Sequence, residues 1–510
     1  MKFLKNKEFY HLLLQIGIIL FPVQEMYRSF FGDTVQIAGF AAEEILILLW
    51  VGLLFAGGVF VCLCEKRKKP LIFVGIYAAV FLVFTLLHAL NASRFNASLL
   101  PSAQPSLIRE AYYTVRMYGA PLFAAGAAVL LKTPAQKIFS ALKAAAWILC
   151  LGIVIPDLFG FSFASYVDGN VVVNGGFFSW FSLGEDADFA RYTAKGLFSS
   201  ANDVAAVLFG LTPFAAYSCL KNKKPLDYIL LLLVGLSSIM VGTKIGAYGF
   251  FLALGATLLF AALGALMKKE KNSLSSLLIS AVIFIVLVPL LLMSPGKRLQ
   301  DLRNRQAQGS RPTDSIDEVE DLPTEEDADF SEEETRLLEE YVTEHHWDHF
   351  INPWFLELYP VSEDPEFWTE IITRPNHLNS DSRAFKIHMI RRIVARNENP
   401  SDALFGIGFT SGIPYAEKDY VNQYYLFGLV GILVLFWPFA ALFALSCKEV
   451  LLRLFRRKNF LLPFVPALSL FAFFVTAYFA GHVFDTQFST YFLCFSLSAV
   501  IPAVLSDENA

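Results

Sequence analysis

Long apolar stretches, separated by shorter polar ones, occupy most of this chain of 510 residues. Many of them approach the ~20 residues that a helix needs to cross the ~30 Å hydrocarbon core of a bilayer. Backbone polar groups inside a bilayer must be satisfied within the protein, so each stretch is expected to be helical. The pattern predicts twelve membrane spans, approximately at residues 10–30, 41–63, 70–90, 111–131, 138–159, 201–220, 226–242, 246–267, 273–294, 421–446, 460–480 and 489–505.

Basic residues recur in every second segment between the predicted spans. They occur in MKFLKNKE at the start and in segments 64–70, 132–137, 221–224, 268–271 and 447–458. Short cytoplasmic loops carry an excess of Lys and Arg, so these segments are expected in the cytoplasm. An even number of spans then places both termini there. No small-residue cleavage site follows the first apolar stretch, which is therefore interpreted as a span and not as a signal peptide.

One long polar segment, residues 295–420, is expected on the opposite side, between spans nine and ten. It holds 27 acidic and 13 basic residues over 295–419, so most of the acidic charge of the chain lies there. The acidic run 313–340 has few apolar residues to bury and is expected to be flexible. Residues 341–412 are rich in aromatic and aliphatic side chains and are expected to fold as a small cap. The predicted organisation is nine spans over 1–294, a loop over 295–420 and three spans over 421–510.

Composition supports the membrane class and narrows the chemistry. The chain is 55% hydrophobic and 17% charged, with a mean hydropathy of +0.51, which is outside the range of ordinary soluble domains. All six cysteines lie in or beside apolar stretches, so neither a disulfide framework nor a structural zinc site is expected. His345 and His349, four residues apart, could share a metal on one helix face, but a solvated helix is the preferred interpretation. No metal, cofactor or nucleic-acid partner is expected.

Several cations fall where the predicted topology faces outward. Lys244 lies in VGTKIGAYG, a very short turn between spans seven and eight, which holds its ammonium at the membrane surface. Arg191 and Lys195 precede span six, and Asn202 lies at its start. Arg116 lies about two turns inside span four, where a buried guanidinium usually faces a cavity or a partner, although a position near the outer interface also explains it.

A second group of polar residues flanks the return to span ten. Residues 380–399 predict a helix, capped by Ser380 or Asp381, that carries Arg383, Arg391 and Arg392. Arg grips phosphate bidentately, so this helix suits a phosphate-bearing lipid, and simple adhesion to lipid headgroups is the alternative. A turn with Gly406 and Gly408 follows it. Three polar residues then precede or begin span ten: Glu417, Asp419 and Asn422.

These motifs resemble the superfamily of O-antigen ligases and O-antigen polymerases, which are polytopic membrane glycosyltransferases with a GT-C-like, all-α fold. The matching elements are GLFSSANDVA before span six, the GTK turn, SRAFKIHMIRRIVARNENPSDALFGIGF and DYVNQYYLFGLVG. The resemblance covers the whole predicted topology, while the local motifs cover about 80 residues. It implies residence in the bacterial cytoplasmic membrane. It also implies a lipid-linked oligosaccharide on a polyprenyl diphosphate as substrate, membrane lipids around the chain and a chain-length regulator as a partner.

The resemblance also implies roles for the candidate residues. Lys244 and Arg383, followed by Arg191, stabilise the departing diphosphate without a metal. Asp419 or Glu417 accepts the proton of the attacking sugar hydroxyl, and the sequence does not choose between them. The remaining candidates contact the diphosphate or the glycan: Lys195, Arg391, Arg392, Arg116, Asn422 and Asn202.

Two departures from the ligase pattern favour a polymerase of lipid-linked repeat units. EKDYVNQYY lacks the His that ligases place at the entry to span ten, and Lys244 stands where ligases have Arg. A ligase acting on another acceptor is the first alternative, and a twelve-helix secondary transporter is the alternative from another class. A peptidoglycan-type polymerase and a metal-dependent lipid-linked glycosyltransferase are further enzyme alternatives.

Overall fold

The computed structural model describes residues 6–32, 36–37, 40–167, 169–267, 274–309, 330–456 and 458–506. Its described part is almost entirely helical, and eleven helices are long and apolar enough to cross a membrane. These spans are α1 (Lys7–Phe31), α2 (Ala42–Cys64), α3 (Lys68–Ala92), α4 with η3 and α5 (Leu107–Thr114, Val115–Gly119 and Ala120–Leu131), α6 (Ala135–Leu158), α7 (Ala201–Asn222), α9 (Lys244–Leu266), α10 (Leu274–Met293), α18 (Asp419–Phe455), α19 (Leu461–Phe479), and α20 with α21 (Gln487–Ser498 and Val500–Leu505). The predicted all-α polytopic membrane fold is confirmed.

The seventh predicted span is a shorter helix. It forms α8 (Pro225–Val241), an apolar helix of 17 residues that begins with Pro225 in its first turn and ends at Gly242. Gly242 has a left-handed φ of 76°, a conformation that favours glycine and stops the helix there. The eleven long helices and α8 together occupy the twelve predicted positions.

The chain divides into two compact units. The first contains residues 1–80, 115–303 and 436–510, and the second contains residues 81–114 and 304–435. α3 and α18 therefore each contribute to both units.

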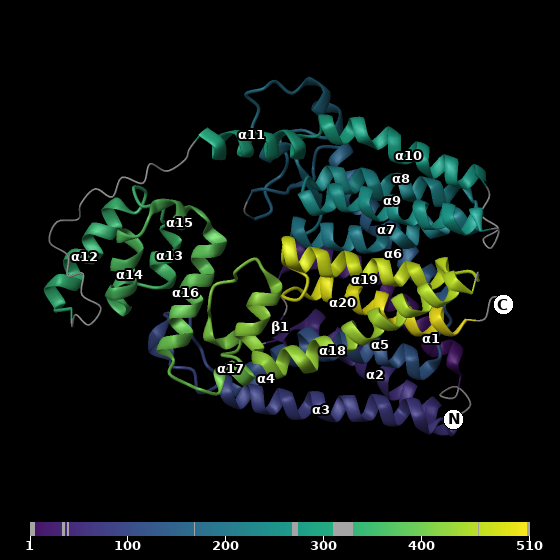
Figure 1. The fold of residues 1–510 in the computed structure, drawn as a ribbon, viewed down its shortest axis with the longest axis horizontal. Helices are drawn as coiled ribbons and strands as arrows, with labels where there is room; N and C mark the ends of the chain where they lie inside the picture. The colour runs from purple at the N-terminus through teal and green to yellow at the C-terminus, as the bar shows by residue number, and fades with distance from the viewer. Residues whose placement is uncertain are drawn as a thin grey trace. The chain divides into compact units, whose positions relative to one another are not determined.

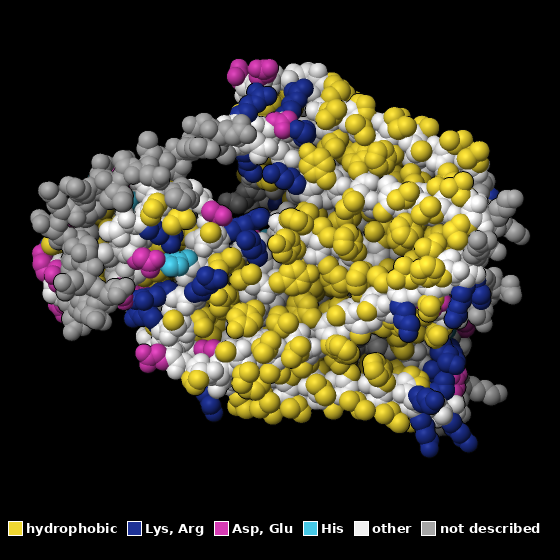
Figure 2. Space-filling view, viewed as in Figure 1, with side chains coloured by type: hydrophobic (Ala, Val, Ile, Leu, Met, Phe, Trp, Pro, Cys, Tyr) yellow, Lys and Arg dark blue, Asp and Glu magenta, His cyan; other side chains and the backbone are white. Residues whose placement is uncertain are grey.

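In the first unit, α7 is the central helix and packs against α8, α9 and α19 (Figure 1). Small residues allow this close packing, because a Cβ at Gly210 would lie 2.3 Å from the ring of Phe473. The outer faces of helices such as α2, α9 and α10 expose large apolar side chains, and Figure 2 shows these covering the face of the bundle. Such a surface suits lipid and not water.

Short strands and turns join some of these helices. β1 (Gln36–Ile37) pairs antiparallel with β2 (Phe40–Ala41), and β3 (Phe163–Ala164) pairs antiparallel with β4 (Ala194–Gly196). The segment between β3 and β4 holds two 3₁₀ turns, η4 (Phe177–Ser182) and η5 (Phe189–Tyr192). α11 (Pro295–Gly309) follows α10 after the single residue Ser294.

The second unit contains the short helices of the long polar segment. They are α12 (Glu332–His345), α13 (Trp354–Leu358), η6 (Val361–Glu363), α14 (Pro365–Thr373), α15 (Asn376–Ser380), α16 (Ser382–Arg396), α17 (Asp402–Phe405) and η7 (Phe409–Ser411), joined by η2 (Ala97–Leu99). Their buried side chains include Tyr359, Trp368 and Phe385, and Phe95 and Leu100 complete the same hydrophobic core. Aromatic residues of the segment 341–412 therefore lie in one hydrophobic core together with residues 95–103.

The acidic run lies partly outside the described residues. Residues 313–329, in which flexibility is expected, are among those not described. Its last part begins α12, where the hydroxyl of Ser331 accepts from the Glu334 N–H and the Glu334 carboxylate accepts from the Ser331 N–H. This capping box explains why an acidic sequence starts a helix there.

Candidate functional site

The GTK turn of the first unit is a helix stop followed at once by a helix start. Thr243 caps α9 by accepting the Gly246 N–H at 3.1 Å, so Lys244 becomes the first residue of that helix. Lys244 is exposed, and among the described residues no hydrogen bond or ion pair engages its side chain. The turn therefore presents an exposed ammonium group at the start of α9.

Two other segments of the chain hold this turn in place. The Gly242 carbonyl accepts from the Tyr166 hydroxyl at 3.1 Å and from the Gln300 amide at 2.9 Å. The backbones of Gly242 and Gly296 also pack so closely that a Cβ on either would lie about 3 Å or less from the other. The position of the residue after the turn is thus fixed by the β3–β4 segment and by α11.

The other outward candidates of the first unit differ in their surroundings. Arg191 is half-exposed, with its Nε 3.5 Å from an oxygen of Asp188. Lys195 is buried, and its Nζ donates to the Gly169 carbonyl at 3.1 Å. Asn202 is the second residue of α7, which Ser200 caps. Lys195 therefore supports the loop, whereas Arg191 is accessible to a ligand.

Arg116 lies in the π-helical segment η3, a local departure from α-helix that often marks a functional position. Its guanidinium forms an ion pair with Glu44 of α2 and also borders a cavity. The expectation that this Arg faces a partner or a cavity agrees with both contacts.

In the second unit, the structure joins two of the predicted catalytic residues. Asp381 caps α16 by accepting the N–H groups of Arg383 and Ala384. The Arg383 Nε then lies 3.1 Å from Glu417 Oε2, and the Lys386 Nζ lies 3.0 Å from Glu417 Oε1. Burial raises the pKa of Glu417, but the Lys386 ammonium and the Arg383 guanidinium outweigh it and hold that pKa below its usual value. Glu417 is therefore a carboxylate clamped between two cations.

Asp419 and Asn422 lie in the first turn of α18. Asp419 is fully buried, and the Tyr415 hydroxyl donates to its Oδ1. Asn422 is 3% exposed, and its Oδ1 has no hydrogen-bond donor among the described residues. Both side chains stand close in sequence to Glu417 in a water-poor environment.

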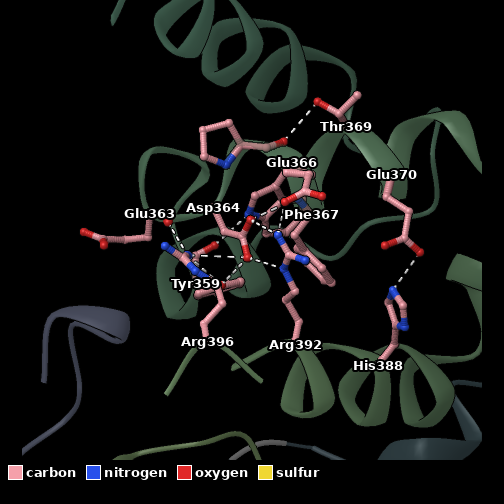
Figure 3. Close-up of polar contacts among 12 residues, drawn as sticks. Tyr359, Glu363, Asp364, Glu366, Phe367, Thr369, Glu370, His388, Arg392 and Arg396 are labelled. Atoms are coloured by element: carbon pink, nitrogen blue, oxygen red, sulfur yellow. Dashed lines mark hydrogen bonds and ion pairs between the residues drawn. The ribbon is translucent and has the colours of Figure 1, made fainter. Parts of the chain in front are cut away.

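The remaining arginines of α16 are not equivalent. The Nε of Arg391 lies 3.3 Å from the hydroxyl of Tyr425, and Arg391 is exposed. Arg392 instead binds Asp364 bidentately, at 2.7 and 3.0 Å, and also contacts Glu366 (Figure 3). The guanidinium of Arg392 is thus paired with carboxylates of the protein, although the sequence suggested that it binds the diphosphate or the glycan.

Asp364 is the centre of this network. Besides Arg392, it accepts from the Tyr359 hydroxyl at 2.6 Å and the Phe367 N–H at 3.1 Å, and Arg396 lies 3.4 Å away (Figure 3). Burial raises the pKa of Asp364, but its donors, led by Arg392, outweigh burial and leave the pKa below its usual value.

Substituting Asp364 with Asn is expected to destabilise the second unit by about 3–5 kcal/mol, because it leaves partly buried guanidinium charge uncompensated. Because the pKa of Asp364 is lower in the folded protein than in the unfolded chain, its ionised carboxylate stabilises the fold. This stabilisation is complete above the unfolded pKa of about 3.9 and is lost as the pH falls through the folded pKa. The loss should therefore appear in thermal unfolding at pH 7 of the full chain in detergent. Glu366→Gln, at an exposed ion pair, is the control and is expected to cost less than about 1 kcal/mol. Equal effects of the two variants would contradict this role.

A buried polar network missed by the sequence interpretation holds the glycine turn. Glu110 is fully buried and accepts from the N–H groups of Phe409 and Thr410, at 3.0 and 2.8 Å, and from His88 Nε2 at 2.9 Å. The other ring nitrogen of His88 lies 2.6 Å from the carbonyl oxygen of Phe405. His88 lies inside the apolar stretch 70–90, where ionisable residues are rare and usually have a role, so this signal was available for His88. Glu110 lies just before the predicted span 111–131 and carries no such signal.

His345 and His349, considered above as a metal pair and interpreted instead as part of a solvated helix, contact other side chains. His345 Nδ1 lies 3.1 Å from Asp348, and His349 Nε2 lies 3.2 Å from the hydroxyl of Tyr341. Across the part of the chain that the structure describes, no group of three His, Cys, Asp or Glu residues is arranged to hold a metal ion.

These features define a multi-pass, all-α membrane protein that carries cations and carboxylates at the ends of its membrane helices. Residues 7–506 match the model of the family of O-antigen ligase like membrane proteins, and the chain belongs to that family. Membership supports a glycan-processing function in a membrane. No curated protein matches the chain.

Proposed function

We propose that this protein transfers a glycan from a polyprenyl diphosphate to a sugar hydroxyl of a second lipid-linked unit, and so polymerises repeat units into a surface polysaccharide. The proposal places the reaction at the outer face of the bacterial cytoplasmic membrane, with both termini in the cytoplasm. Family membership is the observation that favours glycan transfer over a secondary transporter.

The cluster of Arg383, Lys386 and Glu417 is the observation that carries the proposal. Breaking a glycosyl–diphosphate bond releases the electron pair to the diphosphate oxygen, where negative charge develops. Preorganised cations stabilise such charge more in the transition state than in the ground state. In the proposal, Arg383 meets this charge, and Glu417 keeps Arg383 oriented until the lipid arrives. Lys244 and Arg191 of the first unit are proposed, each by itself, as further cations for a diphosphate.

The general base is Asp419 in this proposal. A base works best when its pKa lies near the working pH, and two cations pull the pKa of Glu417 in the opposite direction. Asp419 is buried and receives a hydroxyl donor. It takes the proton of the attacking hydroxyl as the new glycosidic bond forms, and Asn422 orients the sugar through its amide. Arg392 and Lys195 are given structural roles only, while Arg391 remains a proposed contact of the glycan.

The assignment predicts unequal effects of two isosteric variants. Asp419→Asn is expected to lower the turnover by about 10²–10⁴-fold, the usual contribution of a general base. Glu417→Gln is expected to cost less, because it loosens Arg383 without removing the base. Turnover is measured on purified chain in vesicles with extracted lipid-linked repeat unit. A larger loss in Glu417→Gln than in Asp419→Asn would exchange the two roles.

Polymerase and ligase activity separate in a simple experiment. Deleting the gene in its host is expected to leave single lipid-linked repeat units and no long polymer, and the plasmid-borne wild type is expected to restore a ladder of lengths. The absent His near Asp419 and the Lys at position 244 support this outcome. Accumulation of full-length, unattached lipid-linked polymer in the deletion strain would instead identify a ligase, the alternative within the family.

A further inference from the structure

A cavity of about 340 Å³ lies within the first unit, and neither Lys244 nor Arg191 lines it. It is bounded by α1, η3, the start of α7 and the segment that leads into α20. Its size is at the lower end of small-ligand sites, which span roughly 300–1,000 Å³. Its polar lining comes from segments that are far apart in the sequence and includes Glu25, Arg28, Arg116, Asp203, Asp485 and Gln487.

Three acceptor atoms in this lining have no donor among the described residues. They are Asp203 Oδ1, Asp485 Oδ1 and Gln487 Oε1. Asp203 is 4% exposed and Gln487 is 3% exposed, so bulk water does not satisfy them by open contact. Each buried acceptor without a donor costs about 1–3 kcal/mol. Three of them around one cavity indicate a ligand that brings several hydrogen-bond donors.

The fold holds these acceptors in fixed places. Asp203 is in the first turn of α7, where the helix dipole favours a negative charge and Ser200 accepts its N–H. The other oxygen of Asp485 lies 2.9 Å from His482 Nδ1. The neighbouring Glu25 is engaged by the Ser199 hydroxyl at 2.6 Å. The acceptors are therefore oriented before any ligand enters.

The lining offers both hydrogen-bond acceptors and hydrogen-bond donors. Glu25, Asp203 and Asp485 share it with Arg28 and Arg116, and His482 lies beside Asp485. The described residues form no group of three suited to a metal ion, here as elsewhere. Phe488 adds an apolar side to the cavity. Several acceptors, two guanidinium donors and an aromatic ring match the hydroxyl groups and the apolar face of a sugar.

We infer that this cavity is a sugar subsite that holds one residue of the glycan through Asp203, Asp485 and Gln487. The inference rests on the proposed glycan transfer, and it names a second place where the substrate is recognised. Polyprenyl diphosphate without sugar does not use this subsite. The specificity of the protein for its repeat unit then depends in part on α7 and on the start of α20.

The test compares two probes on the purified full chain in detergent. The free oligosaccharide, released from its lipid by hydrolysis, is expected to raise the melting temperature of the wild type, because a ligand that binds only the folded state stabilises it. Gln487→Met keeps the length of the side chain and removes its acceptor, and Asp203→Asn keeps the shape and replaces one carboxyl oxygen with an NH2 donor. Both are expected to weaken binding of the oligosaccharide at least 10-fold and to leave binding of sugar-free polyprenyl diphosphate unchanged. Asp186→Asn, at an exposed position of the β3–β4 segment, is the matched control.

The outcomes separate this inference from the proposed function. If wild type and variants bind the oligosaccharide equally, or if the variants lose both probes together, the subsite is wrong, whatever the turnover. If the wild type binds the oligosaccharide, the variants do not, and the wild type transfers no glycan, the subsite stands and the proposed reaction fails. If the oligosaccharide never shifts the melting temperature at millimolar concentration, the cavity holds water only and the inference is overturned. Either variant alone decides the matter if the other fails to fold.

Discussion

Arg383→Ala is expected to lower glycan transfer by about 10²–10³-fold, the usual loss when one preorganised donor to a developing anion is removed. The guanidinium stands in the first turn of α16 and is oriented by Glu417 at 3.1 Å. Alanine removes the charge and also leaves Glu417 with Lys386 as its remaining cation at 3.0 Å. Lys386 keeps that carboxylate paired, so the variant should fold. The measurement is polymer length in cells and turnover of the purified chain.

The matched control is Arg336→Ala. Arg336 belongs to the same unit, and its ion pairs with Glu333 and Glu340 are exposed. It is expected to leave both the protein level and the polymer unchanged. Lys244→Ala should act in the same direction as Arg383→Ala if both meet the diphosphate. Normal polymer in the two variants, at normal protein levels, would overturn the assignment of both cations.

Gly406→Ala is expected to prevent stable folding of the second unit. Gly406 has a φ of 74°, and a Cβ would lie 2.1 Å from the Leu426 carbonyl oxygen. Ile407 and Gly408 donate their N–H groups to the carbonyls of Tyr425 and Leu426 at 3.0 Å, so the two backbones cannot separate without breaking these bonds. The combined loss should be about 2–5 kcal/mol, from left-handed strain of about 1–2 kcal/mol and overpacking of about 1–3 kcal/mol. Folded yield and melting temperature in detergent report it.

Gly169→Ala is the control that has the left-handed backbone conformation without the steric contact. Gly169 has nearly the same φ, 73°, but nothing lies within 4 Å of its added Cβ. Only the left-handed strain of about 1–2 kcal/mol remains, so this variant should fold with a modest fall in melting temperature. Similar behaviour of the two variants would show that the crossing at Gly406 is looser than the structure indicates.

The membrane helices were the part of the fold most open to prediction. Hydropathy alone locates the spans, because each must bridge one apolar layer and satisfy its own backbone. The GTK turn was also predictable, since Gly242 and Thr243 are a helix stop and a helix cap in sequence. The non-helical backbone at Gly428, which interrupts α18, was not predictable. In the sequence Gly428 lies within an apolar stretch, where a glycine usually indicates close packing between helices. Its φ of 67° comes from its contact with the backbone of Leu404, which is distant in sequence.

The candidate site was predictable as a set of residue types but not as a set of partners. Arg383 and Glu417 each stood out as charged residues beside a membrane helix, yet their pairing depends on how α16 folds back on the segment before α18. Arg392 looked like its neighbour Arg391 until the structure placed Asp364 against it. Asp203 and Gln487 lie almost 300 positions apart, and neither belongs to a motif that sequence alone could join.

The network around Asp364 has a consequence for how the protein discriminates among anionic surfaces. α16 carries five basic residues, Arg383, Lys386, Arg391, Arg392 and Arg396. Four carboxylates of the same unit, Asp364, Glu366, Glu370 and Glu417, contact residues of this helix. The helix is therefore close to neutral in the folded protein, and its long-range attraction for bulk acidic phospholipid is far weaker than its sequence suggests. A ligand gains from it only by reaching an individual guanidinium at short range, where geometry and not net charge decides what is held.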